Sequence, residues 1–226
     1  MMDTIILIDK PHGMTSFGVV ARIRRILQEQ AGKKVKVGHT GTLDPFATGL
    51  MIIVTGKECK NAGQYSKLDK VYEATFRLGE TSTTGDPEGE ILQVSDRQPS
   101  LEELETVLGE FIGEIQQRPP IYSAIKVNGQ RAYKLARKGH EVELPLRTVV
   151  IHSLILLDYV YPEVKIRVHV SSGTYIRSLA EGIGKKLGTG AYCLSLRRTQ
   201  IGDYLVKDAK TLKSYGIDVG VARQNN

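Results

Sequence analysis

Apolar residues occupy every second position from 72 to 78 and again from 164 to 170. A two-residue period places these side chains on one face of an extended chain, so both segments are predicted to be strands with one buried face. Lys165, Arg167 and His169 lie between the apolar residues of the second strand and give it a basic outer face. The short apolar runs 4–8 and 51–54 predict two further, buried strands.

Three other segments repeat their apolar residues with helical spacing. The first follows Thr15 and Ser16, either of which can cap a helix N-terminus. Its predicted apolar face consists of Val19, Val20, Ile23, Ile26 and Leu27. The second follows Ser100 and Glu103, which form the sequence of a capping box. The third is predicted over 174–187, just before a glycine.

The order of these elements indicates the fold class. Strands and helices are intermixed without a regular strand–helix–strand rhythm, which favours an α+β fold over a doubly wound parallel sheet. The segment 81–89, rich in Thr, Gly, Asp and Pro, is predicted to be a loop. A chain of 226 residues without internal repeats can fold as one large domain, and we expect residues 1–226 to do so.

Composition narrows the environment and the chemistry. Cys59 and Cys193 lie far apart with no histidine at ligand spacing, which argues against a zinc site or disulfides and favours the cytoplasm. No apolar stretch is long enough to span a bilayer. The formal net charge of +6 is compatible with a polyanionic partner without requiring one. No phosphate loop or dinucleotide motif is present, so a carboxylate working without cofactor or metal is favoured.

The segment 118–145 combines basic residues with tyrosines. Its relevant side chains are Tyr122, Lys126, Arg131, Tyr133, Lys134, Arg137 and Lys138. Cations interleaved with aromatic rings are typical of a surface that contacts phosphates and stacks on bases. An ordinary exposed loop with a short helix explains the same composition, and the pattern alone leaves both readings open. The basic outer face of the first helix, with Arg22, Arg24 and Arg25, is equally open to a solvated-surface reading.

The run 38–50, G-H-T-G-T-L-D-P-F-A-T-G-L, concentrates three glycines, one histidine and one carboxylate ahead of a predicted strand. Asp44-Pro45 alone would be explained as a tight turn. The run closely resembles the signature of the TruB-type tRNA pseudouridine synthases. Five further segments resemble motifs of that family in the same order: 10–16, 68–79, 119–124, 172–179 and 194–198. The resemblance implies a mixed, largely antiparallel sheet with a central RNA-binding cleft flanked by helices and loops.

The resemblance also implies roles for individual residues. Asp44 takes the place of the catalytic aspartate, and Arg177 that of the arginine that keeps it ionised. Tyr72 corresponds to the tyrosine that stacks on the target uracil and takes the C5 proton. The matching residues expected to bind substrate are His39, which braces the gap left by the flipped base, Tyr175 and Leu196 of the pocket wall, Lys10, Arg131 and Lys134.

Without the motifs, each of these residues has an ordinary structural explanation. Tyr72 and Leu196 would be core side chains of their strands, Arg177 an exposed helix residue and His39 a loop histidine.

The implied activity is isomerisation of uridine 55 in the T-loop of tRNA, without a cofactor or a metal. The segment 118–145 would be a thumb that closes on the T-arm, and we expect a monomer that does not bind membranes. About 20 residues follow Leu205, too few for the C-terminal PUA domain of many bacterial members. Two alternatives are a non-catalytic RNA-binding protein or chaperone and a guide-dependent synthase like dyskerin. The intact Asp44, Tyr72 and Arg177 argue against the first, and the missing PUA domain against the second.

Overall fold

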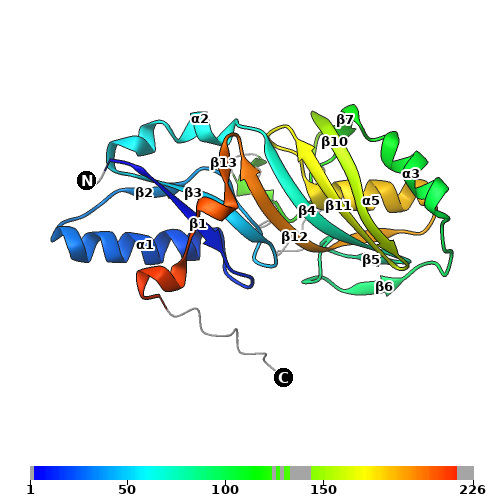
Figure 1. Ribbon diagram of the computed structural model, residues 1–226, viewed down its shortest axis with the longest axis horizontal. Helices are drawn as coiled ribbons and strands as arrows, with labels where there is room; N and C mark the ends of the chain where they lie inside the picture. Colours follow the sequence, from blue (N-terminus) through cyan, green and yellow to red (C-terminus); the bar gives the residue numbers. More distant parts are fainter. Residues whose placement is uncertain (1–2, 124–125, 128–129, 133–143, 218–226) are drawn as a thin grey trace, which may run out of the picture. The chain divides into compact units, whose positions relative to one another are not determined.

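The computed structural model describes residues 3–123, 126–127, 130–132 and 144–217. The chain divides into two compact units. The first unit contains the residues up to Tyr72 and those from Leu196 onward, and the second runs from Glu73 to Ser195. The chain passes from one unit to the other within two long strands, β4 (Lys70–Leu78) and β12 (Ala191–Ile201) (Figure 1).

The first unit is built on a mixed sheet. Besides parts of β4 and β12, its strands are β1 (Ile5–Lys10), β2 (Val37–His39), β3 (Thr48–Thr55), β13 (Tyr204–Leu205) and β14 (Lys210–Thr211). Strand β3 runs antiparallel to β1 and β2 and parallel to β12, whereas β14 lies parallel to β1 at the edge. All but the first residue of β3 are buried, which confirms the buried strand predicted over 51–54.

Helix α1 (Ser16–Ala31) belongs to the first unit and follows the predicted pattern. The Thr15 side chain accepts a hydrogen bond from the Gly18 N–H at 3.0 Å, so Thr15 is the N-cap. The buried residues of α1 include Val19, Val20 and Ile23 of the predicted apolar face. The remaining helical elements of this unit are short: η1 (Gly56–Lys60), α2 (Ala62–Ser66), η2 (Val206–Asp208) and η3 (Leu212–Tyr215).

The second unit contains an antiparallel sheet and two hairpins. Its strands are the start of β12, then β4, β11 (Glu163–Val170), β10 (Arg147–Val160) and β7 (Gly113–Gln117), in that order. The hairpins are β5 (Glu80–Ser82) with β6 (Ile91–Gln93) and β8 (Lys126–Val127) with β9 (Gln130–Arg131). The four apolar residues of the repeat 164–170 are all fully buried, which confirms the predicted one-sided strand.

The described residues of the second unit also include the helices α3 (Leu101–Gly109) and α5 (Ile176–Leu187), which contact each other. Ser100 and Glu103 form the predicted capping box at the start of α3. Helix α5 begins two residues later than predicted because Tyr175 has an extended backbone and serves as its N-cap. The predicted loop 81–89 begins inside β5 and forms the turn of the β5–β6 hairpin.

The architecture is an α+β fold with a mixed, largely antiparallel strand arrangement, as the sequence predicts. Within the described part of the chain, no helix is both long and apolar enough to cross a membrane.

Candidate active site

Asp44 lies half-buried in the loop that joins β2 to β3 in the first unit. Its carbonyl accepts a hydrogen bond from the Ala47 N–H at 3.1 Å, which closes the Asp-Pro turn. Gly49 follows with φ +106°, and a Cβ there would lie 2.3 Å from the Arg198 carbonyl oxygen. Both the backbone conformation and the close approach of β12 therefore require glycine at this position of the motif.

Lys10 holds this loop from the end of β1. Its side chain is fully buried, and its ammonium donates to the carbonyl oxygens of Pro11, Met14 and Pro45 at 2.9, 2.7 and 3.2 Å. Pro45 directly follows Asp44. These contacts place the Lys10 charge on the backbone beside Asp44, and its expected substrate-binding role stays a prediction.

Arg198, the last residue of the 194–198 motif, holds the other side of the loop, although no role was predicted for it. Its side chain on β12 is also buried, and Nε donates to the Leu50 carbonyl at 2.8 Å. Its Nη2 donates to the Gly41 carbonyl at 3.1 Å. Gly41 precedes Asp44 by three residues. Two buried cations from different strands therefore fix the loop backbone before and after Asp44, and both contribute positive potential to this loop.

The start of α1 is attached to the same loop. The Ser16 hydroxyl donates to the Leu43 carbonyl and accepts from the Leu43 N–H, both at 2.8 Å. The Gly13 N–H donates to the Pro45 carbonyl at 2.8 Å. These bonds explain why the 10–16 motif accompanies the 38–50 motif: the first segment supplies the contacts that shape the second.

Three further residues expected at the site belong to the first unit. Tyr72 on β4 and Leu196 on β12 are each only 8% exposed, so both are compatible with a core role as well as with a pocket wall. His39 is half-buried at the end of β2, one residue before the loop that carries Asp44. The Thr199 hydroxyl donates to the Val71 carbonyl at 3.2 Å and fixes β12 beside the residue that precedes Tyr72.

Arg177 belongs to the second unit and lies in the first turn of α5. It is 3% exposed, which rules out the alternative that it is an exposed helix residue. Its Nη1 donates to the Thr84 carbonyl at 2.8 Å and to the Asp86 carboxylate at 2.9 Å. Its Nη2 donates to the Tyr122 carbonyl at 2.9 Å. The guanidinium therefore connects α5 to the β5–β6 hairpin and to the start of 118–145.

Asp86 is the partner that the sequence reading missed, because the segment 81–89 was read only as a loop. Its side chain is buried, and it also accepts hydrogen bonds from the Thr84 hydroxyl at 2.5 Å and from the Glu88 N–H at 3.1 Å. The three donors to the buried Asp86 carboxylate therefore include the Arg177 guanidinium. The two side chains form a satisfied ion pair, which sets the orientation of Arg177.

Tyr175 is held by its backbone. The Gln117 side chain, at the end of β7, accepts from the Tyr175 N–H at 2.7 Å and donates to the Tyr175 carbonyl at 3.0 Å. The side-chain amide thus pairs with both backbone groups and fixes the residue at the N-terminus of α5. This clamp fixes the backbone of the half-buried Tyr175 two residues before Arg177.

The thumb predicted over 118–145 lies mainly outside the described residues. Lys134 is not described, and of Arg131 only the backbone, in β9, is described. The beginning of the segment is attached to α5, since the Ser178 hydroxyl donates to the Arg118 carbonyl at 2.9 Å. The substrate-binding roles of Arg131 and Lys134 stay predictions.

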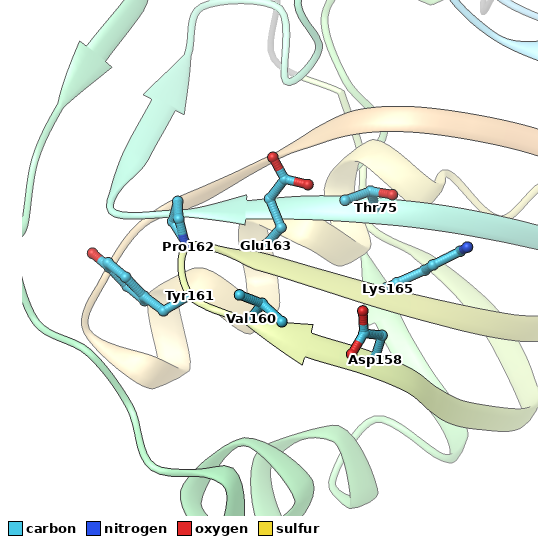
Figure 2. A pocket seen from close by; sticks show the side chains of 7 residues that line it. All are labelled: Thr75, Asp158, Val160, Tyr161, Pro162, Glu163 and Lys165. Atoms are coloured by element: carbon cyan, nitrogen blue, oxygen red, sulfur yellow. The ribbon is translucent and has the colours of Figure 1, made fainter.

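Two other features of the second unit lie apart from the predicted residues. A pocket of about 300 Å³ lies where β10 and β11 join, and none of the residues expected at the site lines it (Figure 2). Its lining residues are Thr75, Asp158, Val160, Tyr161, Pro162, Glu163 and Lys165. The rings of His152 and His169 lie 4.6 Å apart on β10 and β11. Imidazoles are common metal ligands, although these two were not predicted from their spacing.

Residues 24–176 match the family described as TruB family pseudouridylate synthase (N terminal domain). The chain is 47% identical over 213 residues to tRNA pseudouridine synthase B of Phocaeicola vulgatus, covering 93% of this chain and 91% of that protein. It is 50% identical over 201 residues to the protein of the same name from Parabacteroides distasonis, covering 88% and 86%.

Solved structures of similar fold include a Cbf5–Nop10–Gar1 complex, with a TM-score of 0.69 and 31% identity. Another is an H/ACA RNP bound to a substrate RNA containing 2′-deoxyuridine, with a TM-score of 0.68 and 29% identity. In both cases the match covers 95% of this chain and 56% of the other, so this chain spans little more than half of those proteins.

Proposed function

The chain belongs to the TruB family of pseudouridylate synthases, and we propose that it isomerises uridine 55 in the T-loop of tRNA to pseudouridine. The name that its relatives share, tRNA pseudouridine synthase B, supports tRNA as the substrate. The motif resemblance over almost the whole chain supports position 55. The observation that carries the proposal is the Asp44 loop, whose backbone is fixed by the buried charges of Lys10 and Arg198.

The reaction suits these residues. Isomerisation breaks the bond between N1 of the base and C1′ of the ribose, turns the uracil, and forms a bond from C5 to C1′. The C5 proton is removed, and N1 gains a proton, so atoms and electrons balance without an oxidant or a second substrate. We propose Asp44 as the nucleophile or base, which requires its ionised form. Positive potential from Lys10 and Arg198 favours that form.

We propose that Arg177 assists Asp44, as the family resemblance implies. A guanidinium carries five N–H donors, so its bonds to Asp86, Thr84 and Tyr122 are compatible with a further carboxylate acceptor. In this proposal Asp86 acts through Arg177 and is a positioning residue.

The target base must leave its stack before it can react. We propose that Tyr72, Tyr175 and Leu196 form the pocket for the flipped uracil and that His39 braces the gap it leaves. The segment 118–145, with Arg131 and Lys134, would hold the T-arm through its phosphates. RNA loops are recognised by shape and by their unstacked bases, which fits a T-loop substrate.

Asp44→Asn tests the proposal with an unmodified tRNA transcript and position-resolved detection of pseudouridine. We expect the variant to lose turnover by at least ~5 kcal/mol of transition-state stabilisation. Its RNA affinity should be retained, since a neutral isostere leaves phosphate contacts in place. Asp203→Asn, at an exposed position between β12 and β13, is the matched control and should remain active.

The outcomes separate the two classes of function. Turnover by Asp44→Asn would remove Asp44 from the mechanism. A wild-type protein that binds tRNA and forms no pseudouridine would favour the RNA-binding or chaperone alternative. Pseudouridine at a position other than 55 would support the pseudouridine synthase activity and refute the assignment of uridine 55 as its target.

A further inference from the structure

Phe17 is exposed over 66% of its surface at the start of α1, close to buried residues of the same helix. Its neighbour Ser16 and the following apolar residue Val19 are both buried. A phenyl ring left in water forgoes the stabilisation that burial gives. An exposed aromatic ring with cations beside it is a candidate contact for the bases of a nucleic acid.

The surroundings of Phe17 are basic. The guanidinium carbon of Arg24 lies 6.0 Å from the centroid of the Phe17 ring, within the range of a cation–π contact. Arg24 is held there by a hydrogen bond from Nη2 to the Val37 carbonyl at 3.1 Å. Arg22 is exposed and its Nη1 donates to the Gly18 carbonyl at 3.3 Å, one turn back along α1. An aromatic face flanked by fixed cations is the combination that binds the bases and phosphates of unpaired RNA.

The position of Phe17 relative to the Asp44 loop follows from two attachments within the first unit. Arg24 bonds to Val37, and Ser16 bonds to Leu43. The segment 37–43 therefore runs antiparallel to α1, from the turn of Arg24 toward the turn of Phe17. His39 lies between these two attachments, and Asp44 directly follows the second. Phe17 thus stands at the end of α1 that is tied to the Asp44 loop.

We propose that Phe17 is an RNA contact whose ring stacks on a base of the bound tRNA neighbouring the flipped uridine. In this proposal, Arg22 and Arg24 face the phosphates on either side of the base that stacks on Phe17. The inference rests on the proposed function, because it takes the RNA that reaches Asp44 as the occupant of this surface. The charge of the surface selects this occupant, since three arginines of α1 lie within eight residues of Phe17.

The test measures the binding of unmodified tRNA transcript to Phe17→Ala over a series of salt concentrations. We expect Kd to rise by about 5- to 150-fold, the range for one base stacked on an aromatic ring. The slope of log Kd against log salt should not change, because stacking releases no counterions. Phe17→Trp keeps a stacking face and should bind as well as the wild type. Arg22→Ala should reduce the slope by roughly 0.7–0.9.

Val160→Ala is the matched control, since Val160 is 69% exposed, lies in the second unit and is not flanked by arginines in sequence. It should bind RNA like the wild type. Thermal unfolding of each variant shows whether α1 remains folded. Unchanged RNA binding by Phe17→Ala, or an equal loss in Phe17→Trp, would overturn the inference.

Pseudouridine formation by the wild type on the same transcript reports on the proposed function separately. If Phe17→Ala weakens binding while the wild type forms no pseudouridine, the stacking contact stands and the catalytic assignment fails. If the wild type is active and Phe17→Ala binds normally, the catalytic assignment stands and the stacking contact fails.

Discussion

The Arg177 guanidinium and the Asp86 carboxylate, 91 positions apart in sequence, meet at 2.9 Å with both side chains at most 4% exposed. Such a pair costs desolvation when it forms, and it is strongly destabilising to break because one charge then stays buried alone. The pair therefore makes the geometry of Arg177 dependent on a residue of the β5–β6 hairpin.

Asp86→Ala tests this dependence. We expect the free energy of unfolding to fall by about 3–5 kcal/mol, and turnover of tRNA to fall further than the unfolded fraction explains. Urea denaturation and single-turnover assays measure the two effects. Asp96→Asn, an exposed acid of the same unit, should change neither. Equal stability of the two variants would show that the ion pair contributes nothing.

Arg198→Met and Arg197→Met form a matched pair on β12. The Arg198 guanidinium bonds to the Gly41 carbonyl, whereas that of Arg197 bonds to the Asp9 carboxylate at 2.7 Å and is partly exposed. We expect Arg198→Met to lower kcat at least tenfold with little change in RNA affinity, because the Asp44 loop loses one of its two buried cationic anchors. Arg197→Met should keep kcat within a few-fold.

The split between kcat and affinity separates loop positioning from general destabilisation, and Arg198→Lys should recover part of kcat by retaining the charge. Equal kcat in the two methionine variants would contradict the positioning role.

Tyr72→Phe removes one hydroxyl and keeps the ring on the buried face of β4. If the hydroxyl takes the C5 proton, the variant should bind RNA normally and lose most product formation. Rapid-quench measurements under single-turnover conditions detect the loss directly. A wild-type rate would assign Tyr72 to packing, in agreement with its low exposure.

The buried side chain of Lys70 is expected to make the free energy of unfolding depend on pH. Burial, with a smaller contribution from Arg198, lowers the pKa of Lys70 from 10.5 to about 8. Between these values the unfolded chain binds more protons than the folded one, so the free energy of unfolding rises with pH. We expect a rise of about 2 kcal/mol between about pH 7.5 and pH 9.5. Urea denaturation at several pH values measures it.

Lys70→Gln should remove most of this rise, while Lys67→Gln, at an exposed lysine of the same region, should retain it. A Lys70→Gln profile parallel to that of the wild type would show that other groups cause the pH dependence.

Local patterns predicted the elements well because their determinants are local. The capping box of Ser100 and Glu103 and the alternation over 164–170 are each contained within eight residues, and both were confirmed. The start of α5 was misplaced by two residues, because the Gln117 clamp on the Tyr175 backbone comes from β7 and leaves no trace beside Tyr175.

The hydrogen-bond and ion-pair partners of the site residues could not be predicted from local sequence patterns. Asp86 looks like any turn aspartate until α5 brings Arg177 to it. The burial of Lys10 could not be predicted from the sequence, because a lysine next to a proline suggests an exposed strand end. Its acceptor on Pro45 is a backbone carbonyl, which every residue has, so the sequence does not mark it as a partner. Motif resemblance located the Asp44 loop, but only the tertiary contacts identify the groups that hold it in place.

The residues that anchor the Asp44 loop are translated at different times. Lys10 and the loop itself leave the ribosome early, whereas Arg198 and the edge strand β14, which pairs with β1, are translated after the entire second unit. The first 72 residues of a nascent chain therefore contain Asp44 but lack the strand that fixes Gly41 and Leu50. Because N-terminal segments otherwise fold first during synthesis, the part of the molecule that carries Asp44 is made first and completed last.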